Sequence, residues 1–112
     1  KKYKEENWLG IIAACVHPES YEIIIKELKN SDISYGFKLN AFKNIPDDYG
    51  VSSTAVWGKG GNPTKILGQR EDITESKFYE FVKKFKDAGA TILGGCCEIR
   101  PSHISKIASL KN

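Results

Sequence analysis

The sequence has no methionine, no internal repeat and no low-complexity tract, and only three cysteines occur among its 112 residues. No apolar stretch approaches the roughly 18 residues that a transmembrane helix needs, and no charged-then-apolar leader with a small-residue cleavage site is present. The 17 basic residues outnumber the 14 acidic ones only slightly and are spread along the chain instead of forming a basic block with aromatics. These absences argue against a membrane-spanning protein, a repeat protein and a nucleic-acid-binding protein.

The odd number of cysteines fits poorly with the paired disulfides of a secreted domain. It fits better with thiols that bind a metal or react in a reducing compartment, so we expect a soluble cytoplasmic protein. The composition, with 40% hydrophobic and 28% charged residues, is that of a globular domain with a single core. Because the chain opens on Lys1-Lys2 with no initiator methionine, we expect a piece of a longer polypeptide.

The first half of the chain predicts two strands with a helix between them. Residues 8–14 are short and almost continuously apolar, as in a strand that is buried on both faces. Pro18 suits the first turn of a helix. The apolar residues that follow recur at helical spacing: Tyr21, Ile24, Ile25 and Leu28. Residues 35–41 are a second strand candidate, with Asn40 near its carboxyl end.

The second half predicts a long loop, two helices and a third strand. Residues 42–70 are rich in glycine and proline, which predicts a loop that either acts as a lid or binding loop or is disordered. Asp72 or Thr74 can cap the next helix, residues 90–93 predict the third strand, and Pro101 opens the last helix. The residues expected to face the core are Phe78, Phe81, Val82 and Phe85 in the first of these helices and Ile104, Ile107 and Ala108 in the last.

Strands that alternate with helices at this spacing predict an α/β fold of parallel βα units. Three parallel strands alone would leave two open sheet edges and an uncovered apolar surface. We therefore expect residues 1–112 either to close against a second copy or to be the last three units of an eight-unit barrel.

The three thiols occupy equivalent positions at the ends of apolar runs. Cys15 ends the first run, and Cys96 and Cys97 follow two glycines after the third. A disulfide between Cys96 and Cys97 would be strained, because neighbouring Cα atoms lie about 3.8 Å apart and ordinary bridges need roughly 4.4 Å or more. If the strands run parallel, all three sulfurs lie at the carboxyl edge of the sheet, where such folds place their sites.

Three converging thiolates form a soft donor set that suits zinc, although a buried cysteine can also be an inert small hydrophobe. A structural zinc normally has four protein ligands, whereas three ligands and an open position are typical of catalytic sites. The position is open unless His17 or His103 fills it. We expect His17 to be a solvated turn residue and His103 to hydrogen-bond backbone at its helix start.

The segment Gly94-Gly-Cys-Cys-Glu-Ile-Arg-Pro-Ser-His-Ile104, together with Cys15 ahead of Pro18-Glu19, resembles the signature of the zinc-dependent homocysteine S-methyltransferase family. The resemblance covers most of the chain, because the order and spacing of the intervening elements also match. It implies the carboxyl-terminal part of a (βα)8 TIM-type barrel. It also implies that Cys15, Cys96 and Cys97 are Zn2+ ligands and that Asn40 is a substrate-binding residue, the alternative for Asn40 being a helix or turn cap.

The resemblance implies transfer of a methyl group to the zinc-bound thiolate of homocysteine, giving methionine. The thiol of free homocysteine, with a pKa near about 8.5, is mostly protonated at neutral pH, and zinc would deprotonate it. The methyl donor stays open between a sulfonium, betaine and folate. Two alternatives remain: a non-catalytic partial barrel whose zinc is structural, and a redox sensor that uses the vicinal cysteines.

Three further residues have open roles. Trp57 and Tyr49 would either cover the methyl donor or simply anchor the long loop. Lys38 would point either outward or toward the mouth of the barrel.

Overall fold

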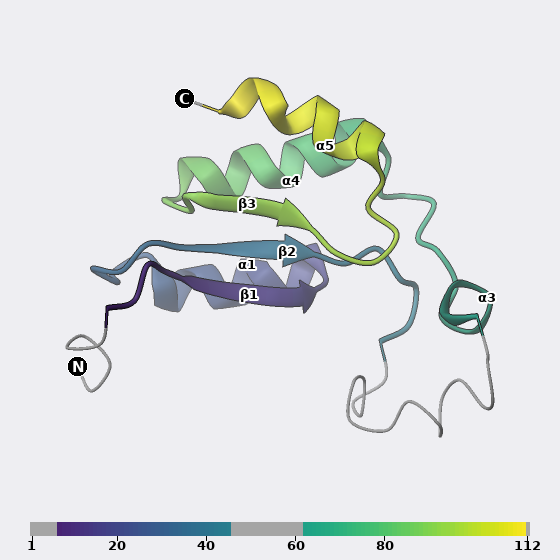
Figure 1. Cartoon of the computed structure of the whole chain (residues 1–112), viewed down its shortest axis with the longest axis horizontal. Helices are drawn as coiled ribbons and strands as arrows, with labels where there is room; N and C mark the ends of the chain where they lie inside the picture. The colour runs from purple at the N-terminus through teal and green to yellow at the C-terminus, as the bar shows by residue number, and fades with distance from the viewer. Residues whose placement is uncertain (1–6, 46–61, 112) are drawn as a thin grey trace.

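The computed structural model describes residues 7–45 and 62–111. In chain order its elements are β1 (Ile11–Val16), α1 (Pro18–Leu28), β2 (Tyr35–Leu39), α3 (Pro63–Leu67), α4 (Glu75–Asp87), β3 (Ile92–Gly95), α5 (Pro101–Ile107) and the short helix η1 (Ala108–Leu110) (Figure 1). The strands form one sheet in the order β1-β2-β3, and both pairings are parallel. The predicted α/β class with parallel βα units is confirmed at this level.

All three strands point toward the same edge of the sheet, and α3 lies beyond that edge (Figure 1). The prediction that residues 42–70 are entirely loop is wrong, because α3 lies within them. Asn62 caps this helix by accepting a hydrogen bond from the backbone N–H of Thr64, and Pro63 occupies its first turn. Tyr49 and Trp57 lie outside the described residues, so their predicted roles stay predictions.

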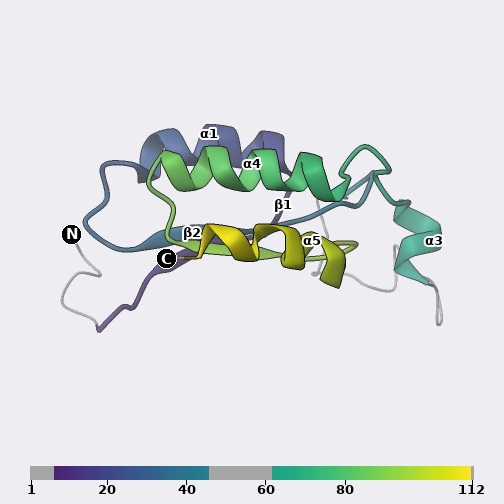
Figure 2. The same cartoon turned by 90° about the horizontal axis from the view of Figure 1, so that it is seen from above.

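Helices α1 and α4 lie side by side over one face of the sheet, as the view from above shows (Figure 2). Three aromatic rings join the two layers: Tyr21 of α1, Phe37 of β2 and Phe85 of α4 meet edge to face at centroid distances of 4.7 to 5.5 Å. All three side chains are fully or almost fully buried. Each edge-to-face pair of this kind stabilises the fold by about 1 kcal/mol beyond the contribution of the buried area.

The opposite face of the sheet carries no helix among the described residues (Figure 2). Along β2 the side chains alternate, so Phe37 and Leu39 are buried under the helices whereas Lys38 is exposed on the other face. Ile12 of β1 is 45% exposed on the described chain. Among the described residues, this face therefore exposes both an apolar and a charged side chain.

Helix α5 packs on α4 through a face that differs from the predicted one. Ile107 is buried as predicted, but Ile104 is 42% exposed and Ala108 is also exposed, so those two expectations are wrong. His103 takes the inward position instead, with its ring edge to face against Phe78 at 5.6 Å. Residues 103 and 107 share a face because they are one turn apart, which rotates residues 104 and 108 outward.

No helix among the described residues is long and apolar enough to cross a membrane.

Gly36 of β2 allows the central strands to approach closely. A Cβ atom at this position would overlap the backbone carbonyl of Ile92 on β3, so Gly36→Ala is expected to lower the free energy of unfolding by roughly 3 kcal/mol. Gly94→Ala is the matched control, because the nearest atoms to a Cβ there lie at 3.6 and 3.7 Å, an ordinary contact. Urea unfolding of both variants measures the difference; equal losses would contradict this description of the sheet.

Candidate metal centre

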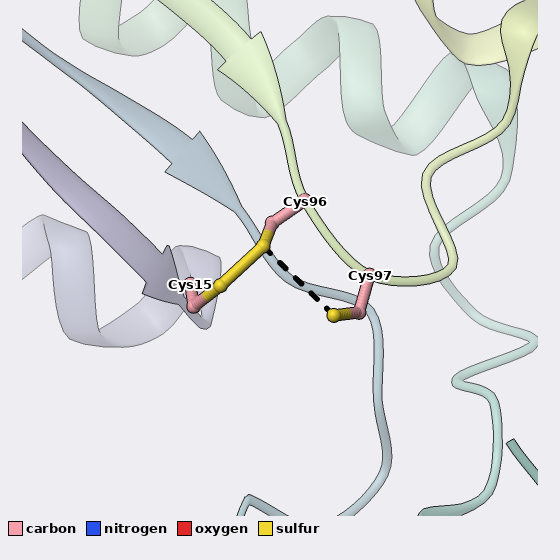
Figure 3. A group of neighbouring side chains, drawn as sticks. All are labelled: Cys15, Cys96 and Cys97. Atoms are coloured by element: carbon pink, nitrogen blue, oxygen red, sulfur yellow. Dashed lines mark hydrogen bonds between the residues drawn. A yellow bond between two sulfur atoms is a disulfide. The ribbon is translucent and has the colours of Figure 1, made fainter. Parts of the chain in front are cut away.

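Cys15 lies in a bulge near the carboxyl end of β1. Ala14 pairs with Lys38 and Val16 with Leu39, so Cys15 is the extra residue between them. Its φ of 55° is in the left-handed region that side-chain-bearing residues rarely adopt. The bulge interrupts the alternation of side chains along β1 and turns that of Cys15 toward the end of β3 (Figure 3).

Cys96 and Cys97 follow the last residue of β3, and the backbone holds both against the end of β2. The N–H of Cys96 donates to the carbonyl of Leu39 at 2.7 Å, and the carbonyl of Cys97 accepts from the N–H of Ala41 at 2.9 Å. Glu98 then takes a left-handed φ of 62°, which turns the chain toward α5. Both cysteines therefore lie on irregular backbone beyond the end of β3.

The sulfurs of the three cysteines all lie within 4.8 Å of one another (Figure 3). Cys15 and Cys96 are joined in a disulfide with a Cα–Cα distance of 5.5 Å, and the Sγ atoms of Cys96 and Cys97 are 3.9 Å apart. The bridge thus links the two outer strands and not the vicinal pair that the redox-sensor alternative assumed. The predicted convergence of the thiols is present, whereas their role as metal ligands stays a prediction.

The Cys96–Cys97 pair has a sulfur separation that suits a tetrahedral zinc ion, whereas Cys15 could join such a site only after its disulfide with Cys96 is reduced. Two thiolates that bind zinc at about 2.3 Å with tetrahedral angles are about 3.8 Å apart. The Cys96–Cys97 sulfur separation of 3.9 Å matches this value. Among residues 7–45 and 62–111, no histidine or carboxylate joins the three cysteines in the cluster. A tetrahedral zinc ion held by these three thiolates would therefore have one position for a further ligand.

Neither histidine is presented to the thiols. Nε2–H of His103 donates to the carbonyl of Ile73 at 2.7 Å, and its Nδ1 accepts from the N–H of Arg100 at 3.0 Å. The expectation that His103 hydrogen-bonds backbone at its helix start is confirmed. The expectation that His17 is solvated is wrong, because its ring is half-buried and Nε2–H donates to the carbonyl of Phe42 at 2.6 Å.

Glu98 links the thiol loop to α3, a contact that the sequence analysis missed. One carboxylate oxygen accepts from the hydroxyl of Thr64 at 2.5 Å and the other from the guanidinium of Arg100 at 2.9 Å. The Glu98 side chain is only 9% exposed, so the pair with Arg100 is partly shielded from water. The cap and proline at Asn62-Pro63 could have indicated the helix, but nothing in the sequence pairs Thr64 with a residue 34 positions away.

Asn40 directly follows β2, between the two strands that carry the thiols. It is fully buried, and its Oδ1 accepts from the N–H of Phe42 at 2.7 Å, which is the turn-capping role considered above. Its Nδ2 is buried and has no hydrogen-bond acceptor in the described part of the chain. A donor of this kind costs about 1 to 3 kcal/mol unless something accepts from it. The proposed substrate-binding role therefore remains compatible with the observed cap.

Arg70 fastens the segment after α3 to the start of α1. Its guanidinium donates to both carboxylate oxygens of Glu19 and to Asp72 at 2.7 to 3.1 Å. These hydrogen bonds lower the pKa of Glu19 and of Asp72, with the attraction of the positive charge acting in the same direction. Of the two predicted caps of α4, the structure has Thr74, whose hydroxyl accepts from the N–H of Lys77.

A family model for homocysteine S-methyltransferases matches residues 1–110. Homocysteine S-methyltransferase 3 of Arabidopsis thaliana is 42% identical over 40 residues, which cover 36% of this chain and 12% of that protein. Mevalonate kinase of Saccharomyces cerevisiae is 32% identical over 81 residues, which cover 66% of this chain and 18% of the kinase. No solved structure matches.

The chain spans 18% and 12% of the lengths of these two relatives, so neither alignment by itself carries the activity of the whole protein. The family model, by contrast, covers nearly every residue, including both segments that carry the thiols. On that match, the chain belongs to the homocysteine S-methyltransferase family.

Proposed function

We propose that residues 1–112 are the carboxyl-terminal part of a homocysteine-binding (βα)8 barrel domain that transfers a methyl group to homocysteine and releases methionine. Cys15, Cys96 and Cys97 hold Zn2+ in this proposal, and Asn40 contacts the substrate. The methyl donor is a sulfonium, betaine or folate. The single observation that carries the proposal is the meeting of three thiols within 4.8 Å at the carboxyl edge of a parallel sheet.

The charge of the centre supports methyl transfer. Three thiolates and a divalent ion give a net charge of about −1, an electron-rich site that favours a cationic methyl donor. Bound there, zinc would keep the substrate sulfur as a thiolate at neutral pH, where the free thiol is mostly protonated. The thiolate sulfur then forms a bond to the methyl carbon, and the electron pair of the broken bond leaves with the donor.

The residues around the thiols hold their backbone in place for this task. Hydrogen bonds from Cys96 N–H and to Cys97 carbonyl fix both cysteines to the end of β2. The guanidinium of Arg100, three residues after Cys97, is paired with the carboxylate of Glu98.

The uncovered face and the two outer strand edges support the barrel as the complete fold. In a barrel both edges pair with further strands, and the exposed face becomes the packed interior. The remaining units belong either to the same longer polypeptide or to a second copy. A cytoplasmic location is part of the proposal, because the thiols must be reduced to bind metal.

The test is whether homocysteine enters the metal centre. Zinc is loaded into the reduced protein, and X-ray absorption at the zinc edge counts sulfur neighbours before and after homocysteine is added. The proposal predicts an increase from about three sulfurs to about four. Homoserine, with a hydroxyl in place of the thiol, is the control and should leave the spectrum unchanged.

The same experiment separates catalysis from a structural metal. If the spectrum is already that of a four-ligand site and homocysteine leaves it unchanged, the zinc only locks the fold. If sulfur enters, methionine formation with each of the three donor classes identifies the methyl donor.

A further inference from the structure

Lys38 lies at the centre of the sheet on the face without helices. Its register partners are Ala14 on β1, which directly precedes Cys15, and Gly94 on β3, which stands two residues before Cys96. Both partners are small, so the lysine is the only long side chain in this row of three. The space over Gly94 is used by the lysine stem, since a Cβ at Gly94 would lie 3.7 Å from Lys38 Cγ.

The Lys38 side chain therefore leans toward β3, the strand that leads into Cys96. Gly94 and Cys96 are two residues apart, which is about 6.6 Å along a strand. A lysine side chain is long enough to bring its charge into the space in front of the thiols. The position is unlike that of the other lysines, which lie on helices or in connecting segments, as far as the described residues go.

No carboxylate in residues 7–45 or 62–111 pairs with Lys38. The amide Nδ2 of Asn40, two residues further along the chain, is also a donor without an acceptor in the described part. The end of the central strand thus holds two side-chain donors, the Lys38 ammonium and Asn40 Nδ2, that have no acceptor among the described residues. Lysines enclosed by protein are almost always paired. In the proposed barrel, where further strands cover this face, Lys38 would be enclosed and its charge would need an anion.

We propose that Lys38 binds the carboxylate of the thiol substrate while the substrate sulfur occupies the thiolate centre. This inference rests on the proposed function, since it takes the ligand to be a thiol amino acid. A carboxylate supplies two acceptor oxygens with a full negative charge, which matches an ammonium better than any neutral group does. Lys38 is then a specificity residue that selects thiols bearing an acid group a few bonds from the sulfur.

The experiment compares two truncated forms of homocysteine in the reduced, zinc-loaded protein. Mercaptobutanoate keeps the thiol and carboxylate but lacks the amino group, whereas aminopropanethiol keeps the thiol and amino group but lacks the carboxylate. Calorimetry gives the dissociation constant of each for the native protein, Lys38→Met and Lys38→Arg. We expect Lys38→Met to weaken mercaptobutanoate by roughly 10-fold to 100-fold and to leave aminopropanethiol within about 3-fold. Lys38→Arg should recover most of the loss.

Lys26→Met is the matched control, because Lys26 is an exposed lysine on α1, the helix that lies on the other face of the sheet. Zinc content must be equal in all variants; a fall in Lys38→Met would assign the lysine to the structure of the site and overturn the proposal. Equal weakening of both thiols, or of neither, would also overturn it. If neither thiol binds the native protein, both the proposed function and this inference are wrong. If both thiols bind but Lys38→Met does not distinguish them, only this inference is wrong.

Discussion

Cys96→Ser is expected to weaken zinc binding by roughly 1,000-fold, and Cys15→Ser and Cys97→Ser should each have a similar effect. Structural zinc sites are worth about 10 to 16 kcal/mol, so one thiolate accounts for several kcal/mol. A serine hydroxyl keeps its proton at neutral pH and cannot replace that charge. Competition against a chromophoric chelator under reducing conditions measures the affinity, and the absorption of the cobalt-substituted protein reports the number of thiolate ligands.

Ser102→Ala is the control for this series. Ser102 is close to the cysteines in sequence, but its hydroxyl donates to Glu75 at 2.8 Å on the α4 side. Zinc affinity should therefore be unchanged. Stoichiometric zinc that survives in any of the three cysteine variants with near-native affinity would remove that cysteine from the metal centre.

Oxidation is expected to abolish zinc binding, and a dithiol reductant should restore it. The disulfide between Cys15 and Cys96 consumes two of the three proposed ligands, and Cys97 alone cannot hold the ion. Zinc should in turn protect the thiols, because a coordinated thiolate is less available to an oxidant. Zinc content before and after reduction, together with the mass added by an alkylating reagent, measures both effects. The oxidised chain should be labelled at Cys97 and the reduced chain at all three positions.

Cys97→Ser separates oxidation from metal binding. This variant should still form the Cys15–Cys96 disulfide, whereas Cys15→Ser should not. Equal zinc content in the oxidised and reduced native protein would show that the bridged cysteines are not ligands.

The helices and strands could be predicted from the sequence where the apolar residues of a segment recur at one clear spacing. Pro18 and the stripe that begins at Tyr21 predicted α1 to the residue at its start, since proline and helical spacing agree there. The first strand was predicted at residues 8–14 but runs from Ile11 to Val16, because a continuous apolar run has no marker for its ends. Helix α3 was missed because the surrounding glycines and prolines outweighed one short helical segment.

The sequence predicted that the three cysteines meet, but it did not predict the bulge and the side-chain contacts that surround them. Their positions at strand ends placed the three thiols at one edge, but no pattern indicates the bulge that redirects Cys15. The contact between Glu98 and Thr64 and that between Arg70 and Glu19 join distant parts of the chain. Such pairings depend on the packing of whole elements, which one sequence does not specify.

Cys15 and Cys96 are separated by 81 residues and lie at the ends of β1 and β3, which are not paired with each other, so a bond between them links the two outer strands of the sheet. Closing a loop of that length restricts the unfolded chain and is worth about 4.5 kcal/mol in the chain-entropy account. A shared metal ion would impose a similar restriction. The melting temperature should therefore differ between the protein with free thiols and the protein whose cysteines share a disulfide or a metal ion. This comparison needs no assay of methyl transfer.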